Sequence, residues 1–183
     1  MKTLRNMLAK RKARMLSDQK GVAAVEFALL LPFLLLLYLG GVELLQGILI
    51  QRQATLTATT VANIVGQYTS ISASTQMPDI LNAAVQIFAP NAPANATVVV
   101  SLITIDSSGN ATVTWSQASM GSGRAKGPIT VPATLDIPST TLLFSETTYA
   151  YTPVIDFIHM GTKNLYASIY MVPRASTTIN LTS

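Results

Sequence analysis

The longest apolar stretch of the chain lies near its N-terminus. Residues 27–42 read FALLLPFLLLLYLGGV without a charged residue, and mostly apolar positions flank them on both sides. A hydrocarbon core about 30 Å thick needs about 20 helical residues. We therefore predict a helix over residues 22–67, with a membrane span over about 22–50. Apolar positions three and four apart continue beyond the span, and Gly66 predicts the end of the helix.

The rest of the chain, residues 68–183, alternates between short apolar runs and turn signals. A helix is predicted from about Asp79 to Phe88, where Pro90 stops it. Runs rich in β-branched and aromatic residues, bounded by turn residues, predict strands; these cover residues 97–105, 111–116, 142–151 and 165–172. Residues 119–139 are rich in Gly, Ser and Pro and predict an irregular loop. The predicted fold class is α+β, a long N-terminal transmembrane helix followed by a small domain with an antiparallel sheet.

The positive charge is concentrated at one end. Residues 1–20 hold seven of the twelve Lys and Arg residues and a single acid, although the chain carries a net charge of +4. A nucleic-acid-binding domain would carry its cations on its folded part, so nucleic acid is not an expected partner. Beyond the span, Arg52 is the nearest cation. Because cations favour the cytoplasmic side, this asymmetry predicts a cytoplasmic N-terminus and an external C-terminal domain.

An ordinary cleaved signal peptide fits this segment poorly. Such a peptide has an apolar region of about 7–15 residues followed by a small-x-small site. The stretch here is longer, and a cut near Gly40 would place Tyr38 at a position that requires a small residue.

Glu26 is an acid at the edge of the apolar stretch. An acidic residue in mid-membrane costs about 2.5–3.5 kcal/mol, and less near the interface, so such a residue is a candidate for function. It could also lie among lipid headgroups and stabilise the positive end of the helix dipole. Gly21 precedes Glu26 by five positions, at the junction between the basic tail and the apolar stretch.

These residues carry a family resemblance. The segment KGVAAVEFALLLPFLLLL, residues 20–37, resembles the N-terminus of class III prepilins and most closely the TadE/TadF-like pseudopilins of the tight-adherence (Tad, type IVc) pilus system. Phe27 after the glutamate and Leu-Leu-Pro ending at Pro32 also match the TadE pattern. The C-terminal pieces YAYTP, at residues 149–153, and Pro-Arg resemble the family more weakly. Residues 70–140 match nothing that we can name.

The resemblance implies processing and assembly. In this family a membrane prepilin peptidase removes a basic leader after a glycine, which here is residues 1–21, cut between Gly21 and Val22. Glu26 then becomes the fifth mature residue and, with Phe27, takes part in subunit assembly. The implied partners are inner-membrane lipid, the prepilin peptidase, other pilin or pseudopilin subunits and the Tad assembly machinery. The implied location is the bacterial inner membrane, with a single pass and residues 68–183 in the periplasm. Incorporation into the extracellular pilus is a second implied location.

The spacing has a physical reason. Cleavage after Gly21 creates an α-ammonium on Val22, and residues 22 and 26 lie on one face of a helix. The carboxylate can therefore reach the amine of its own chain or of a neighbour, and the sequence leaves both open. Gly21 also removes side-chain bulk where a peptidase must bind extended backbone. Pro32 lacks an N–H and is predicted to kink the helix.

Candidate catalytic residues are few. The chain has no cysteine and one histidine, His159, which we expect to be a surface or loop residue. The acids of the C-terminal part are scattered, and the run from Gly121 to Gly127 lacks the spacing of a phosphate-binding loop. We predict no enzymatic activity, no metal and no cofactor.

Two functions remain in view. The first is a non-enzymatic minor pilin or pseudopilin that contributes to pilus assembly, adhesion and secretion. The second is an uncleaved single-pass inner-membrane scaffold of the same secretion machine, similar to TadG. Residue 21 distinguishes them, because a bulky side chain there should block a pilin and spare a scaffold.

Overall fold

The computed structural model describes residues 20–153, 155–156 and 161–183. His159 and all but the last two residues of the predicted leader lie outside the described residues. The chain forms two compact units, residues 1–44 and 45–183. The predicted boundaries of leader, helix and periplasmic domain stay a prediction.

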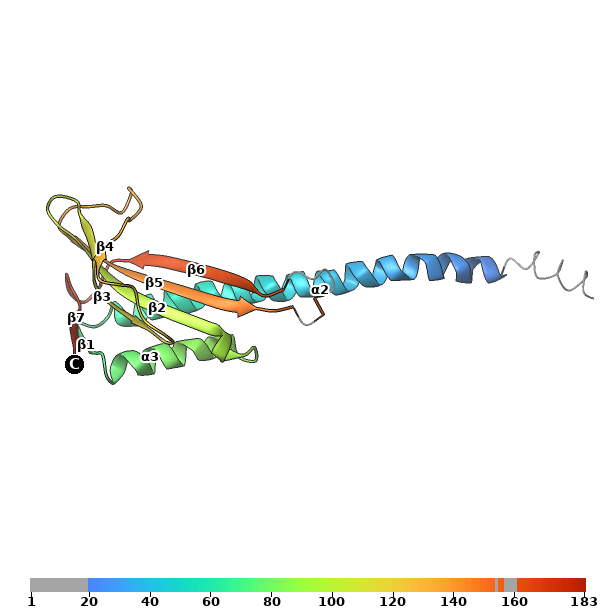
Figure 1. Cartoon of the computed structure of the whole chain (residues 1–183), viewed down its shortest axis with the longest axis horizontal. Helices are drawn as coiled ribbons and strands as arrows, with labels where there is room; N and C mark the ends of the chain where they lie inside the picture. Colours follow the sequence, from blue (N-terminus) through green and yellow to red (C-terminus); the bar gives the residue numbers. More distant parts are fainter. Residues whose placement is uncertain (1–19, 154, 157–160) are drawn as a thin grey trace, which may run out of the picture. The chain divides into compact units, whose positions relative to one another are not determined.

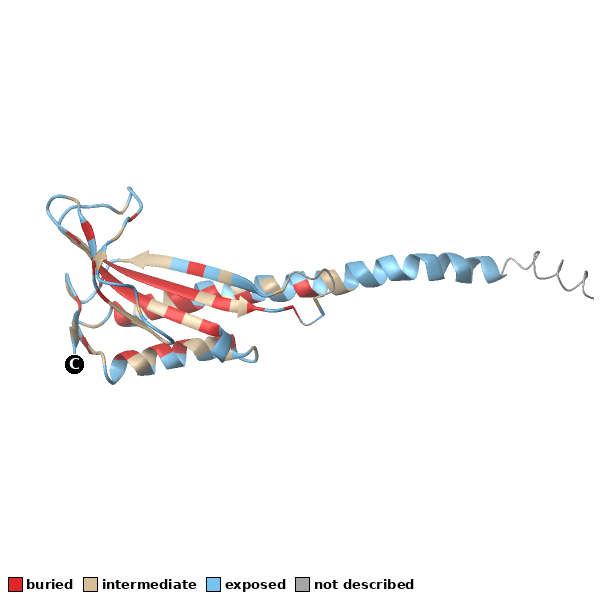
Figure 2. Ribbon diagram, in the orientation of Figure 1, coloured by how far each residue is buried: buried red, intermediate tan, exposed pale blue. Residues whose placement is uncertain are grey.

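The first helix of the described residues, α2 (Lys20–Val65), belongs in part to each unit. In the first unit every residue from Gly21 to Tyr38 is exposed (Figure 2). Leu, Val, Phe and Ala occupy fourteen of these eighteen positions and Glu26 is the one charged residue, so the helix is apolar on every side. Such a helix is stable only when lipid or other protein covers it.

In the second unit, α2 has one buried face. Its buried apolar residues recur three or four positions apart and lie on one side of the helix; they are Ile50, Ala54, Ala58, Val61, Ala62 and Val65. The alanines add no side-chain bulk beyond Cβ, so the helix backbone can lie close to its neighbours.

Gly66 ends α2, as the sequence predicts. Its N–H donates to the carbonyl of Ala62 at 2.9 Å, and its own carbonyl accepts the N–H of Arg174 at 2.8 Å. A Cβ at Gly66 would lie 2.9 Å from the Ala62 oxygen, which explains the need for glycine. The end of α2 is thereby hydrogen-bonded to the C-terminal segment at Arg174.

A five-stranded antiparallel sheet forms the centre of the second unit (Figure 1). Its strand order is β4-β3-β2-β5-β6. The strands are β2 (Ala96–Ile105), β3 (Ala111–Ala118), β4 (Gly127–Pro128), β5 (Thr140–Tyr151) and β6 (Lys163–Met171). The central pair, β2 and β5, stays in register from Ala96 opposite Tyr149 to Ile105 opposite Thr140.

Asp106 closes the hairpin between β2 and β3. Its Oδ1 accepts the N–H of Ser108 at 2.7 Å and of Asn110 at 2.9 Å. These bonds, with those to Asn110 foremost, lower the pKa of Asp106. Gly109 has a φ of 83°, a conformation that favours glycine. The turn predicted from this segment is therefore present.

A second helix, α3 (Gln76–Val85), continues into the 3-10 helix η1 (Gln86–Phe88). Asp79 lies in its first turn, where a carboxylate stabilises the positive helix end. The helix starts about three residues before the predicted position. A further 3-10 turn, η2 (Pro93–Asn95), leads into β2.

Two short strands at distant positions pair in parallel. They are β1 (Ser70–Ser72) and β7 (Asn180–Thr182). The indole Nε1 of Trp115 donates to the carbonyl of Ile179 at 2.8 Å and fastens the tail before β7. Neither strand is predicted from the sequence.

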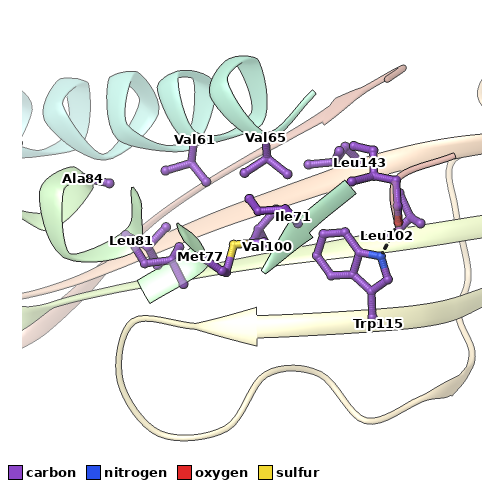
Figure 3. Packing of buried hydrophobic residues seen from close by; sticks show 12 residues of the cluster. Val61, Val65, Ile71, Met77, Leu81, Ala84, Val100, Leu102, Trp115 and Leu143 are labelled. Atoms are coloured by element: carbon purple, nitrogen blue, oxygen red, sulfur yellow. Dashed lines mark hydrogen bonds between the residues drawn. The ribbon is translucent and has the colours of Figure 1, made fainter. Parts of the chain in front are cut away.

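The core has a helix side and an outer side. On the helix side, Val61 and Val65 of α2 point toward a cluster that Met77 and Leu81 enter from α3 (Figure 3). Beyond them lie apolar residues of the sheet, among them Val98, Val100, Leu102 and Leu143. A separate cluster on the other face includes Ile103, Ile105, Leu142 and Phe144. Both faces of the sheet therefore carry buried apolar residues. The predicted α+β class, with its long N-terminal apolar helix and antiparallel sheet, is confirmed.

Candidate functional site

The five residues singled out from the sequence all lie on the exposed N-terminal part of α2. Val22 and Phe27 keep 53% and 59% of their surface accessible. Gly21, Glu26 and Pro32 are exposed as well. The structure therefore presents the whole predicted site on the helix surface.

Packing does not explain the glycine at position 21. A Cβ built on Gly21 meets no atom within 4 Å. An interior helical glycine costs about 1 kcal/mol relative to alanine. A residue that is unfavourable for the helix and unneeded for packing points to a requirement outside the folded chain.

Glu26 is the one charged residue between positions 21 and 42, and it is exposed among apolar neighbours. Val22 lies one helical turn before it, on the same face. The backbone thus provides the spacing that an amine at residue 22 and the carboxylate need in order to meet.

Pro32 lies inside α2, and the helix continues through it. Its missing N–H leaves the carbonyl of Ala28 without its usual helical donor. The predicted kink and the assembly role of Phe27 stay predictions.

The helix itself meets the requirements of a membrane span. Among the described residues, Gly21–Val65 is the one helix long and apolar enough to cross a bilayer. Its most apolar stretch is not buried in the structure. An apolar helix of this kind is suited to membrane anchoring.

The sheet carries a polar cluster that the sequence reasoning missed. We call Arg124, Glu146 and Tyr166 the outer-face cluster. The Arg124 side chain donates twice to Glu146, from Nε to Oε2 and from Nη2 to Oε1, both at 2.6 Å. The hydroxyl of Tyr166 donates to Oε1 of Glu146 at 2.8 Å. Its three residues come from three different segments of the chain, so no local sequence motif predicts the cluster.

The electrostatics of the outer-face cluster favour a fixed ion pair. The hydrogen bonds to Glu146 raise the pKa of Arg124, and burial raises the pKa of the Tyr166 hydroxyl. The guanidinium also lies 5.3 Å from the ring centroid of Phe144. The carboxylate of Glu146 thus accepts hydrogen bonds from Arg124 and Tyr166. The cluster attaches the loop that contains Arg124 to the sheet.

Gly123 makes this attachment possible. A Cβ there would lie 2.7 Å from Ser116, and the hydroxyl of Ser116 accepts the N–H of Arg124 at 2.8 Å. The run from Gly121 to Gly127 is therefore attached to the sheet beside Arg124, whereas the sequence predicted only an irregular loop over residues 119–139.

The described part of the chain contains no group of three or more His, Cys, Asp or Glu side chains that could hold a metal ion. Asp156 accepts the N–H of Gly161 in the loop after β5. The interpretation of His159 falls outside the described residues, so the predicted absence of catalysis stays a prediction.

Comparison with known proteins identifies the N-terminal segment. Residues 21–63 match the family model described as TadE-like protein. No curated protein and no solved structure matches the chain. The resemblance predicted from residues 20–37 is confirmed, and the match extends along α2 almost to its end.

Proposed function

We propose, from the TadE-like segment at residues 21–63, that this chain is a minor pilin or pseudopilin of a tight-adherence pilus. The family match supports a pilin-like protein associated with such a pilus. The finer steps proposed here are removal of the leader, pairing of the new N-terminus and assembly through α2. The observation that carries them is a glycine without a packing role, followed five residues later by the only charged residue between positions 21 and 42.

The first step is cleavage between Gly21 and Val22 by a prepilin peptidase. The bond lies in the first described turn of α2. Glycine then lets the peptidase approach the extended backbone closely.

The second step pairs two charges. Hydrolysis leaves a positive amine on Val22, and Glu26 follows one turn later. Two unit charges about 4 Å apart attract by about 4 kcal/mol at an effective dielectric constant of about 20. This is comparable to the cost of about 2.5–3.5 kcal/mol for holding the acid alone in mid-membrane. The amine therefore offsets the penalty of Glu26, either within one chain or between neighbouring subunits.

The third step is assembly. The chain would insert with its basic end in the cytoplasm, since cations favour that side. Its exposed apolar helix would then exchange lipid for neighbouring subunits. The folded unit, residues 45–183, would cap or decorate the fibre, which favours a minor, initiating or tip role.

The test compares two glycines of the same helix. Gly21 and Gly41 are both exposed, and a Cβ on either meets nothing within 4 Å. We expect Gly21→Phe to retain the leader and Gly41→Phe to lose it, when each is produced with the peptidase. Intact mass measured with and without the peptidase gives the result. Loss of the leader from Gly21→Phe, or its retention by the unaltered chain, would remove the processing step and favour the uncleaved TadG-like scaffold.

A further inference from the structure

A hollow of about 460 Å³ opens between α2 and the loop that follows η1, within the second unit. Half of its lining residues are apolar; they are Leu49, Ile50, Leu56 and Pro90. The other half are one cation and three side-chain amides; they are Arg52, Gln46, Gln53 and Asn91. We call this site the Arg52 hollow. An apolar lining with a few polar groups, at this volume, is typical of sites that bind small molecules.

Side-chain amides join the two walls of the Arg52 hollow. The Nδ2 of Asn91 donates to Oε1 of Gln53 at 3.3 Å, and Nε2 of Gln53 donates to the carbonyl of Ile87 at 3.3 Å. These bonds connect the loop after η1 to α2. The walls are therefore fixed relative to one another before any ligand enters.

The positive charge of Arg52 has no counter-ion at this site. Arg52 is exposed, and within the described part of the chain it forms no ion pair. No residue that lines the hollow is acidic. Glu43 precedes Arg52 by nine positions, or two and a half helical turns, so it lies on the opposite side of α2. Asp79 lines a separate hollow of about 340 Å³ between α2 and α3.

The Arg52 hollow lies at the predicted end of the membrane span. Arg52 follows Gly21 by 31 positions, which corresponds to about 46 Å of helix. A bilayer with its headgroup layers is about 40–45 Å thick. With Gly21 at one membrane surface, Arg52 therefore lies among the headgroups of the other. Leu45 and Leu49 keep 58% and 51% of their surface accessible, so α2 presents apolar surface on the membrane side of the hollow.

We propose that the Arg52 hollow binds one phospholipid with an anionic headgroup, from the leaflet that faces the second unit. This inference rests on the membrane insertion that is part of the proposed function. A guanidinium presents a fork of N–H donors that matches two oxygens of a phosphate. The amides of Gln46 and Asn91 suit a headgroup hydroxyl, because an amide both donates and accepts. The ammonium of a zwitterionic headgroup would find no acid in the lining.

One acyl chain of this lipid would follow the apolar side of α2 into the membrane, past Leu49 and Leu45. The phosphate would stay level with Arg52, since a long basic side chain keeps its charge in the polar layer. The bound lipid would thereby fix the depth of α2 in the bilayer.

Native mass spectrometry of the full chain tests the proposal. The chain is produced with the peptidase, freed of lipid in a non-ionic detergent, and titrated with phosphatidylglycerol, with phosphatidylcholine of the same acyl chains, or with glycerol phosphate. Arg52→Gln and Arg52→Lys are compared with the control Arg174→Gln. Arg174 is also exposed, and its N–H bonds to the carbonyl of Gly66, about 20 Å further along α2. Any charge of a retained leader is common to all variants.

We expect the unaltered chain to bind its first phosphatidylglycerol about tenfold more tightly than phosphatidylcholine, because only the anionic headgroup leaves no ammonium without a partner. Arg52→Gln should remove this preference, Arg52→Lys should keep part of it, and Arg174→Gln should keep all of it. Equal affinities for the two lipids would overturn the inference, as would equal losses in Arg52→Gln and Arg174→Gln. Glycerol phosphate that binds as tightly as the lipid would overturn it as well.

The same spectra separate this inference from the proposed function, because the mass also reports the N-terminus. A chain that begins at Val22 and shows no dependence on Arg52 would refute the lipid site and retain the pilin. A chain that keeps its leader and binds phosphatidylglycerol through Arg52 would refute the processing step and retain the lipid site.

Discussion

Arg124 and Glu146 form a two-pronged ion pair, with both nitrogen–oxygen distances at 2.6 Å. Arg124 lies in the loop after β3, and Glu146 lies on β5 with only 10% of its side chain exposed. The pair thus connects a loop of irregular sequence to the centre of the sheet. Ser116, which accepts the N–H of Arg124, adds a second attachment at the same point.

Removal of Arg124 should destabilise the folded unit. Arg124→Ala leaves the mostly buried carboxylate of Glu146 without its cation, whereas Arg124→Lys keeps the charge but loses the fork geometry. Because 41% of the Arg124 side chain is exposed, we expect a loss of about 1–2 kcal/mol for alanine and less for lysine. Denaturant unfolding of the full chain in detergent measures both variants. Unchanged stability in Arg124→Ala would show that the pair contributes nothing net.

High pH should weaken the same region. Burial raises the pKa of Tyr166 and of Tyr170 above the ordinary value of 10.0. The unfolded chain therefore releases these protons first, so their contribution is complete below about pH 10 and is lost as pH rises through the folded-state values. Unfolding free energies measured at about pH 9 and about pH 11 should differ more in the parent than in Tyr166→Phe. An equal difference in the parent and in Tyr166→Phe would show that Tyr166 is not the cause of the pH dependence.

Trp115 should hold the C-terminal tail in place. Its indole Nε1 donates to the carbonyl of Ile179, next to β7. Trp115→Phe keeps a ring in the core and removes the donor, so we expect a loss of about 1–3 kcal/mol. Amide exchange should accelerate first in residues 180–182, which pair with β1. Exchange that accelerates equally across the sheet would indicate a core defect in place of a released tail.

Some elements of the fold could be predicted because their signals are local. The apolar run of α2 and its end at Gly66 follow from adjacent residues, as does the turn at Asp106 that joins β2 and β3. The predicted strand at 142–151 corresponds to β5, since β-branched and aromatic residues fill it. These predictions depend on periodicity and turn chemistry, which act within a few residues.

The missed elements depend on contacts between distant residues. β1 and β7 are three residues each and stabilise one another across more than a hundred positions, so neither has a local signal. Arg124 and Glu146 are separated by 22 residues, and Gly123 is needed because Ser116 lies against it. Only the folded sheet brings these groups together.

The candidate site could be located from the sequence because it is a linear segment. Gly21, Val22 and Glu26 lie within two helical turns, and the family match begins at residue 21. The hollow between α2 and α3 could not be located in this way, because its two walls come from separate helices. Periodicity identified the apolar positions of α2 but not which of them α3 leaves exposed.

The most direct test is the intact mass of the protein purified from the membranes and sheared filaments of the cells that naturally produce it. The account predicts a mass that corresponds to a chain beginning at Val22. A mass that includes Met1 or any other part of residues 1–21 in the filament fraction would contradict it.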